Sequence, residues 1–463
     1  MAKNNNSPSR RGFLRSLAGA SILMPGMLHE LMAQTAGAAM PDSSNPLAPR
    51  KPMFPAKAKS VIFLYMSGGA SHVDTFDPKP KLTADAGKEY KGTYLSPARW
   101  KFNRYAKCDT QVSELFPHVG SMMDEICVIN SMQNDFNNHT QANMGLHGGS
   151  VVQARPSMGS WVSYGLGTEN QNLPSFMVIA PERPYGGDIV WDANFLPACH
   201  QGIYVKNGGE PIPNMTPTDL AEIQTTKLGM IDYFNRRHAS LRHEDRELAA
   251  RIKTFETAYG MQMEAPEAFD LTKETDATLK LYGMKDRTDT SGFAWQCLMA
   301  RRLVERGVRF IELIDVGTNQ LVNWDAHADM QTHVPLAKNV DQPIAALLKD
   351  LKSRGMLDDT LVAWSTEFGR APGDPNPKAA GRTHQSKVYS SWMAGGGIKG
   401  GITYGQSDDY GFDIAKDRCH VHDFHATILN QLGIDHTKLT YQHSGRDYRL
   451  TDVSGNVIHD ILI

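Results

Sequence analysis

Short apolar runs of strand length recur along this chain, and they are apolar at every position rather than at alternate ones. The clearest is the segment 60–66, Ser-Val-Ile-Phe-Leu-Tyr-Met, which ends just before Gly68 and Gly69. A run that is apolar on both faces is typical of a strand buried in the middle of a parallel sheet. Five further runs share this character: 126–129, 175–180, 308–314, 360–364 and 388–394.

Helical patterns lie between these runs. Apolar residues recur every three or four positions, which indicates amphipathic helices, in the segments 115–124, 143–152, 220–259, 294–306, 336–354 and 423–432. Strands that alternate with helices predict an α/β fold with a doubly wound, mostly parallel sheet. The stretch of about 219–285, rich in Glu, Arg and Lys, is expected to be a helical insertion packed on the outside of the sheet.

The first 40 residues have the pattern of an export signal. Paired arginines, Arg10 and Arg11, are followed by Phe13 and Leu14, a short apolar stretch and then small residues. This order predicts a twin-arginine signal peptide over residues 1–40 and a periplasmic or extracellular mature protein. The alternative is a frayed basic amphipathic helix. Residues 41–58 are expected to be a linker and residues 59–463 the main domain, with no later segment apolar enough to span a membrane.

Composition limits the classes of partner. The net charge is -2 and no long basic run occurs, so nucleic acid is not expected as the main partner. The five cysteines have no CxxC spacing, which indicates small buried hydrophobic residues rather than a metal or redox motif.

Histidine and acidic residues gather after the predicted strands in the last third of the chain. Eight of the 17 histidines fall between His327 and His443. Carboxylate and imidazole groups are the ligands that zinc, manganese and similar cations accept. Four clusters carry the pattern: 323–327 (Asn-Trp-Asp-Ala-His), 365–370 (Ser-Thr-Glu-Phe-Gly-Arg), 381–384 (Gly-Arg-Thr-His) and 422–425 (His-Asp-Phe-His). Because ligands gather at the carboxyl ends of parallel strands, the clusters predict a metal site there.

Four residues are the first candidates for metal ligands: Asp325, His327, Glu367 and His384. Asp325 and His327 are two positions apart, so an extended backbone would point both side chains to the same side. Glu367 follows a predicted strand, and Gly369 allows a sharp turn behind it. His384 lies in a loop rich in glycine and proline, where no apolar face would bury it. The alternatives are a helix-capping role for Asp325 and an ordinary surface position for Glu367.

Other candidates compete with structural roles. His72 and Asp74 follow the first predicted strand and are further possible ligands. His425 lies near the start of a predicted helix, where a polar first turn explains it equally well. Thr140 precedes another helical pattern, so it is a candidate nucleophile at an anion-binding helix terminus, or alternatively only the N-cap.

Three motifs resemble the alkaline phosphatase and sulfatase superfamily, and more closely its twin-arginine-exported branch called domain of unknown function 1501. The resemblance extends from Val61 to Leu432. It rests on 68–80 (Gly-Gly-Ala-Ser-His-Val-Asp-Thr-Phe-Asp-Pro-Lys-Pro), on 358–362 (Asp-Asp-Thr-Leu-Val) leading to 366–370 (Thr-Glu-Phe-Gly-Arg), and on 423–429 (Asp-Phe-His-Ala-Thr-Ile-Leu). The chain departs from the family pattern where active relatives carry Asp after the first strand and Asp-His or Asp-Asn after the later one. It also lacks the Cys-x-Pro-x-Arg signature of sulfatases.

The resemblance implies an alkaline phosphatase-like fold and a metal-dependent hydrolase of phosphate or sulfate esters, with a small molecule or glycan ester as substrate. Zinc, manganese or calcium would act on the ester oxygens. His139, Arg370 and Arg382 are expected to bind the anionic group. The alternative is a non-catalytic relative that binds sulfated or phosphorylated glycans.

Overall fold

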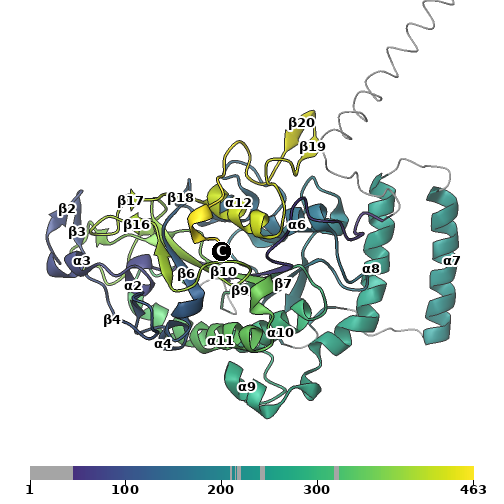
Figure 1. The fold of residues 1–463 in the computed structure, drawn as a ribbon, viewed down its shortest axis with the longest axis horizontal. Helices are drawn as coiled ribbons and strands as arrows, with labels where there is room; N and C mark the ends of the chain where they lie inside the picture. Colours follow the sequence, from purple (N-terminus) through teal and green to yellow (C-terminus); the bar gives the residue numbers. More distant parts are fainter. Residues whose placement is uncertain (1–44, 209–210, 214, 216–219, 240–245, 318–322) are drawn as a thin grey trace, which may run out of the picture. The chain divides into compact units, whose positions relative to one another are not determined.

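A nine-stranded sheet forms the centre of the fold (Figure 1). The structure is a computed structural model, and it describes residues 45–208, 211–213, 215, 220–239, 246–317 and 323–463. The predicted signal peptide lies outside the described residues. In spatial order the strands are β15 (Ile402–Tyr404), β6 (Ile126–Gln133), β14 (Tyr389–Ala394), β10 (Thr360–Ser365), β1 (Ser60–Met66), β9 (Phe310–Asp315), β7 (Phe176–Ala180) and β8 (Ile203–Lys206), with β18 (Cys419–His420) paired to β6.

Most neighbouring strands of this sheet run in the same direction. β1 is parallel to both β10 and β9, and β7 is parallel to β9 and β8. Only β14 is reversed among the described strands of the sheet, because it pairs antiparallel with β10 on one side and β6 on the other. β6 therefore points the same way as β1 and β10, so the carboxyl ends of these strands share one edge. The predicted mostly parallel sheet is confirmed.

Helices cover both faces of the sheet, which confirms the doubly wound class. Along β1, Ile62, Leu64 and Met66 face one hydrophobic core, whereas Val61, Phe63 and Tyr65 face another. The helices are α2 (His72–Thr75), α3 (Pro80–Ala84), α4 (Pro117–Gly120), α5 (His139–Gly148), α6 (Met158–Leu166), α7 (Ala221–Ala239), α8 (Arg246–Phe269), α9 (Asp276–Tyr282), α10 (Phe293–Val304), α11 (His333–Ser353) and α12 (Val421–Gln431). The core with Ile62 includes residues of α10 and α11, and the core with Val61 includes residues of α6 and α12. Both faces of β1 are therefore buried, as its unbroken apolar run requires.

Several helix boundaries differ from those expected from the pattern. α5 begins earlier, at His139, because the Asn138 side chain accepts a hydrogen bond from Thr140 N and caps the helix; it ends where Gly149 adopts a φ of 66°. The predicted helix over 115–124 is reduced to α4 and a 3-10 turn that leads into β6. The region 220–259 contains two helices, α7 and α8. α9 lies within the predicted helical insertion of about 219–285, whereas the pattern did not reveal α6.

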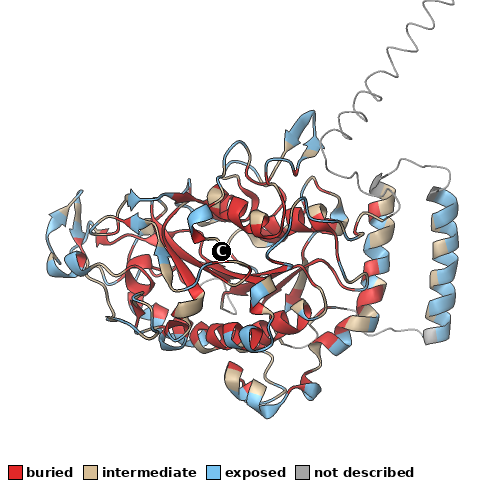
Figure 2. Cartoon of the chain, in the orientation of Figure 1, coloured by how far each residue is buried: buried red, intermediate tan, exposed pale blue. Residues whose placement is uncertain are grey.

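The two helices α7 and α8 differ in exposure, as Figure 2 shows. α8 buries Ala250, Ala265 and Ala268, whereas the described side chains of α7 are exposed or half-buried. Among the described residues, no helix combines the length and apolar character needed to cross a membrane.

Short ladders and one extended segment complete the unit of Ser43–Ile463. Within the predicted linker, Leu47 is buried, and Lys57 N donates to Gln431 O at 2.8 Å. The five cysteines all lie in described residues and form no disulfide. The short ladders are β2 (Glu89–Tyr90) with β3 (Thr93–Leu95) and β12 (Gly373–Asp374), β4 (Phe102–Asn103) with β5 (Val112–Ser113), β11 (Gly369–Arg370) with β13 (His384–Gln385), β16 (Gln406–Ser407) with β17 (Ile414–Lys416), and β19 (Tyr441–His443) with β20 (Arg446–Tyr448).

Buried histidines predict that the fold loses stability in acid. Burial lowers the pKa of His200 and of His333 from 6.5 to about 3. Both rings stay neutral in the folded chain while the unfolded chain takes up protons below its pKa, so stability falls as the pH drops from about 6.5 towards 3. At pH 5 each ring is expected to reduce the free energy of unfolding by about 2 kcal/mol.

Urea unfolding at pH 7 and pH 5 measures this loss. His333→Gln keeps an acceptor for Ser71 N, which donates to His333 Nε2 at 3.2 Å, and should flatten the pH dependence. His459→Gln, at an exposed position, serves as the control and should not. Equal pH dependence in wild type and His333→Gln would contradict the prediction.

Candidate metal centre

The candidate centre lies where several chain segments leave the carboxyl edge of the sheet. Gly68 follows β1, Glu367 follows β10, and Asp325 lies in the segment after β9. The loop after β6 leads to His139 at the start of α5, and the β11–β13 ladder places His384 opposite Arg370. Residues from distant parts of the chain therefore meet at one edge.

Glu367 is fully buried and orients His139. His139 Nδ1 donates to Glu367 Oε1 at 2.7 Å, and the other carboxylate oxygen accepts from Tyr65 Oη at 3.1 Å. Gly68 N lies 3.0 Å from Oε1 and 3.1 Å from Oε2. Burial would raise the pKa of Glu367, but the hydrogen bond and charge of His139 outweigh it and lower the pKa. The carboxylate is thus ionised and saturated with donors.

Gly68 allows this close approach of the backbone. Its φ is 113°, and a Cβ there would lie 2.6 Å from Asp325 N and 2.8 Å from Trp324 N. Any other residue would push the Asp325 segment away from Glu367. The Gly68-Gly69 step therefore serves to pack two segments of the centre together.

Asp325 is the hub of the centre. Its Oδ1 lies 3.1 Å from His327 Nε2 and 3.3 Å from His384 Nε2, and its Oδ2 lies 3.2 Å from His139 Nε2. Arg370 also donates to Oδ1. Burial would raise the pKa of Asp325, but hydrogen bonds from His139 and His384 and the Arg370 guanidinium hold it well below its ordinary value.

The ring nitrogens of two histidines are set up to bind a cation. His139 Nδ1 is committed to Glu367, and His384 Nδ1 donates to Asn137 O at 2.6 Å. Each ring thereby directs Nε2 towards Asp325. Metal-ligating histidines are usually held in this way, by a hydrogen bond from the other ring nitrogen. Nε2 of His139 is buried and lies 3.2 Å from Asp325 Oδ2.

One ligand atom each from His139, Asp325 and His384 lies within 4.8 Å of the others. His327 Nε2 adds a third nitrogen, and so a fourth possible ligand atom, 2.8 Å from His384 Nε2 on a half-exposed ring. Two imidazoles and a carboxylate fit zinc or manganese better than calcium, which prefers oxygen ligands alone. These residues fit a divalent cation.

A proton competes with a cation in this centre. Burial would lower the pKa of His139, but its hydrogen bonds to Asp325 and Glu367 raise the pKa to about 9. Burial and the Arg370 guanidinium lower the pKa of His327. Because a metal ligand must be deprotonated, cation binding would displace the proton from His139 Nε2.

The structure assigns different places to three predicted site residues, His72, Asp74 and Arg382. All three are buried, and His72 Nε2 lies 3.0 Å from Gly411 O. Asp74 forms an ion pair with Arg382 at 2.7 Å, and Arg382 also donates to Pro97 O at 2.8 Å. Because their polar atoms serve each other and the backbone, they are not brought into the centre.

Four more predicted site residues have a different place or role in the structure. Glu367 holds His139 instead of presenting a free oxygen, and His139, expected to bind substrate, directs Nε2 towards Asp325 in the candidate centre. Arg370 is fully buried and donates to Gly69 O at 2.9 Å, to Arg382 O at 3.2 Å and to Gly68 O, so it fixes Asp325 and the loops. Thr140 is exposed in the first turn of α5, and Asn138 rather than Thr140 is the N-cap.

Two tyrosines beside the centre, Tyr65 and Tyr185, were not predicted from the sequence pattern. Tyr65 lies on the buried strand β1, where its hydroxyl is within hydrogen-bond distance of both Asn143 Oδ1 and Glu367 Oε2. Tyr185 stacks on His139 with ring centroids 4.3 Å apart. A tyrosine inside an otherwise apolar run was the one available signal, because a buried phenol requires a polar partner.

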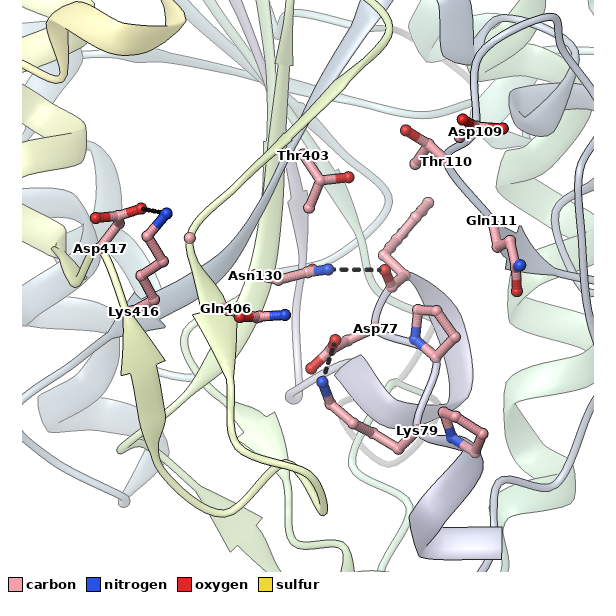
Figure 3. Close-up of a pocket in the computed structure, with 14 residues that line it drawn as sticks. Asp77, Lys79, Asp109, Thr110, Gln111, Asn130, Thr403, Gln406, Lys416 and Asp417 are labelled. Carbon is pink, nitrogen blue, oxygen red and sulfur yellow. Dashed lines mark hydrogen bonds and ion pairs between the residues drawn. The ribbon is translucent and has the colours of Figure 1, made fainter.

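A polar pocket of about 570 Å³ lies elsewhere, beside β6 and β15 (Figure 3). Figure 3 shows Lys79 pointing to Asp77, with a separation of 2.8 Å, and Asn130 reaching the loop before them. Its lining includes Asp77, Lys79, Asn130, Thr403 and Gln406, and none of the residues of the candidate metal centre.

Several solved structures are similar to this chain at low identity. The TAB5 alkaline phosphatase mutant with magnesium bound in its M3 site has 12% identity and a TM-score of 0.36, with 81% of this chain and 98% of that chain covered. The lipoteichoic acid synthase LtaP from Listeria monocytogenes has 8% identity and a TM-score of 0.34, covering 85% and 75%. The PsFucS1 sulfatase from Pseudoalteromonas sp. has 14% identity and a TM-score of 0.36, covering 86% and 74%.

No curated protein sequence matches the chain significantly. The sequence profile of the family described as protein of unknown function (DUF1501) matches residues 58–462. The chain therefore belongs to the DUF1501 family, as its motifs predicted.

Proposed function

We propose that this protein is an exported, metal-dependent hydrolase of phosphate or sulfate esters. The observation that carries the proposal is the convergence of His139 Nε2, Asp325 and His384 Nε2, with both rings held from behind by Glu367 and Asn137. Export rests on the paired arginines of the first 40 residues. The substrate class rests on the resemblance of the motifs 68–80, 366–370 and 423–429 to sulfatases and phosphatases.

The charges of the centre favour binding of a cation, and a bound cation would in turn attract an anionic ester. With neutral imidazoles, the carboxylates of Asp325 and Glu367 and the guanidinium of Arg370 leave one excess negative charge, which favours a cation. When bound, zinc or manganese would act as a Lewis acid on the ester oxygens and lower the pKa of an attacking water. Glu367 keeps the His139 ring in one orientation, and Arg370 keeps Asp325 in place. The exposed edge of His327 lies at the solvent side of the group, where an anionic ester would approach.

Metal analysis of the purified mature chain tests the proposal, together with a panel of phosphate and sulfate esters. We expect bound zinc or manganese and ester hydrolysis that stops on chelation and resumes when the metal is restored. No metal at the centre and no turnover would overturn the proposal. Bound metal without turnover, combined with binding of sulfated or phosphorylated glycans, would favour the non-catalytic alternative.

A further inference from the structure

A second group of potential metal ligands lies outside the candidate centre. One ligand atom each from Asp135, His420 and His422 lies within 4.8 Å of the others. Asp135 is in the loop after β6. His420 ends β18 and is the N-cap of α12, and His422 lies in the first turn of that helix. The strands bring them together, because β18 pairs parallel with the end of β6 and places His420 beside Gln133.

His422 has a free ligand nitrogen on a fixed ring. Its Nδ1 donates to Thr451 O at 2.7 Å, and since a carbonyl can only accept, the neutral ring keeps its lone pair on Nε2. The ring is 8% exposed and stacks on His420 with centroids 4.9 Å apart. A hydrogen bond from the far nitrogen to a carbonyl is the usual support of a metal-binding histidine.

His420 and Asp135 have the spacing of neighbouring ligands. His420 Nε2 lies 3.1 Å from Asp135 Oδ1, and adjacent ligands of a tetrahedral zinc ion are about 3.4 Å apart. Binding through Nε2 would move the ring proton to Nδ1, so the weak 3.3 Å hydrogen bond that Nδ1 accepts from His422 N would be lost. Asp135 is exposed, so one side of the group is open to solvent.

Positive and negative charges both surround the group. Arg418 donates to Gln133 Oε1 next to Asp135, and the amino terminus of α12 carries a partial positive charge. Asp423 offsets this terminus, because one of its oxygens accepts from His420 N at 2.8 Å and the other from Asn456 N at 2.7 Å. Asp423 is therefore a cap rather than a ligand, and Asp135 remains the carboxylate of the group.

The loop that carries Asp135 also shapes the candidate metal centre. Asn134 Nδ2 donates to Glu367 O at 2.9 Å, Asn137 O accepts from His384 Nδ1, and Asn138 caps the helix that begins with His139. Whatever fixes this loop to α12 also fixes the two ligand histidines of the centre.

We propose that Asp135, His420 and His422 bind one zinc-class divalent cation, separate from the candidate metal centre, and that this ion clamps the loop 134–138 to the start of α12. Two imidazoles and one carboxylate with an open side are a ligand set for zinc, cobalt or nickel. The ion would be a structural clamp, and its binding does not depend on ester hydrolysis by the protein.

Cobalt titration of the full mature chain tests the second site, with visible absorption and thermal unfolding as readouts. Asp325→Asn is used as the background because it removes the hub of the candidate metal centre. In that background we expect one bound cobalt ion and a Tm that rises with cobalt. Adding Asp135→Asn, an exposed change that should not disturb folding, is expected to weaken the affinity more than about 10-fold and cancel the Tm rise.

Two further variants sharpen the experiment. His422→Gln should lose the same absorption band, whereas Asp447→Asn, an exposed carboxylate on β20, should leave it unchanged. Absence of cobalt binding in the Asp325→Asn background, or full affinity after adding Asp135→Asn, would overturn the second site. If the candidate metal centre itself binds no metal, wild type and Asp325→Asn will both bind one ion through Asp135, so failures of the two proposals are distinguishable.

Discussion

Asp325→Asn is expected to lower the metal affinity of the candidate centre by at least about 100-fold and to abolish any ester turnover. Among the carboxylates in the described part of the chain, Asp325 alone has oxygens 3.1–3.3 Å from three histidine Nε2 atoms. Asparagine keeps the size of the side chain but removes the charge that balances a cation. Metal content after dialysis and calorimetric titration should show one equivalent less than wild type.

Comparison with Glu367→Gln distinguishes the loss of a direct ligand, Asp325, from the loss of Glu367, which only orients the ligand His139. Glu367 supports His139 from behind, so its variant should lose about 10- to 100-fold in affinity but still bind metal at high concentration. Asp447→Asn is the matched control and should keep the wild-type metal content. An Asp325→Asn protein that folds and retains every equivalent of the wild-type metal would contradict the assignment of Asp325 as the hub.

Asp74→Ala is expected to reduce the free energy of unfolding by about 3–5 kcal/mol without removing metal from the candidate centre. The change would leave the guanidinium of Arg382, 1% exposed, without its charge partner. Ser71 Oγ and Arg99 N, which donate to Asp74 at 2.6 and 2.8 Å, would also lose their acceptor. Urea unfolding at pH 7 measures the loss.

Two further variants test whether the loss of stability in Asp74→Ala comes from the unpaired Arg382 charge. The double variant Asp74→Ala/Arg382→Ala should cost less than the sum of its single variants, because a buried charge is most costly when its partner alone is removed. Asp409→Ala, which breaks the exposed Lys81–Asp409 pair, should leave the urea midpoint unchanged. Loss of a metal equivalent from Asp74→Ala at unchanged stability would instead restore the predicted ligand role of Asp74.

The position of the site could be predicted better than the roles of its residues. The rule that ligands gather at the carboxyl ends of parallel strands located Asp325, His384 and Glu367 at one edge. It could not rank them, because each role depends on which donors reach each oxygen or nitrogen. Glu367 is saturated by Gly68 N and Tyr65 Oη, about 300 positions earlier in the chain, and no local spacing reports such contacts.

The second group of potential ligands also could not be predicted from local spacing in the sequence. His422 was visible within a cluster, but its partner Asp135 lies 285 positions before His420 and carries no local signal. Pairing of β18 with β6 creates the group, and that pairing depends on the order of strands in the completed sheet.

The sequence alone determined the fold class and the edge of the sheet where the candidate ligands lie, because continuous apolar runs must be buried on both faces and polar residues must then follow their ends. Its motifs indicated the family. Only the tertiary structure decided that His139 presents a ligand nitrogen while Glu367, Arg370 and Arg382 serve as buried supports. The physical reason is that a buried charged group must satisfy its hydrogen bonds, and the partners that satisfy Glu367 and Arg382 come from segments far away in the chain.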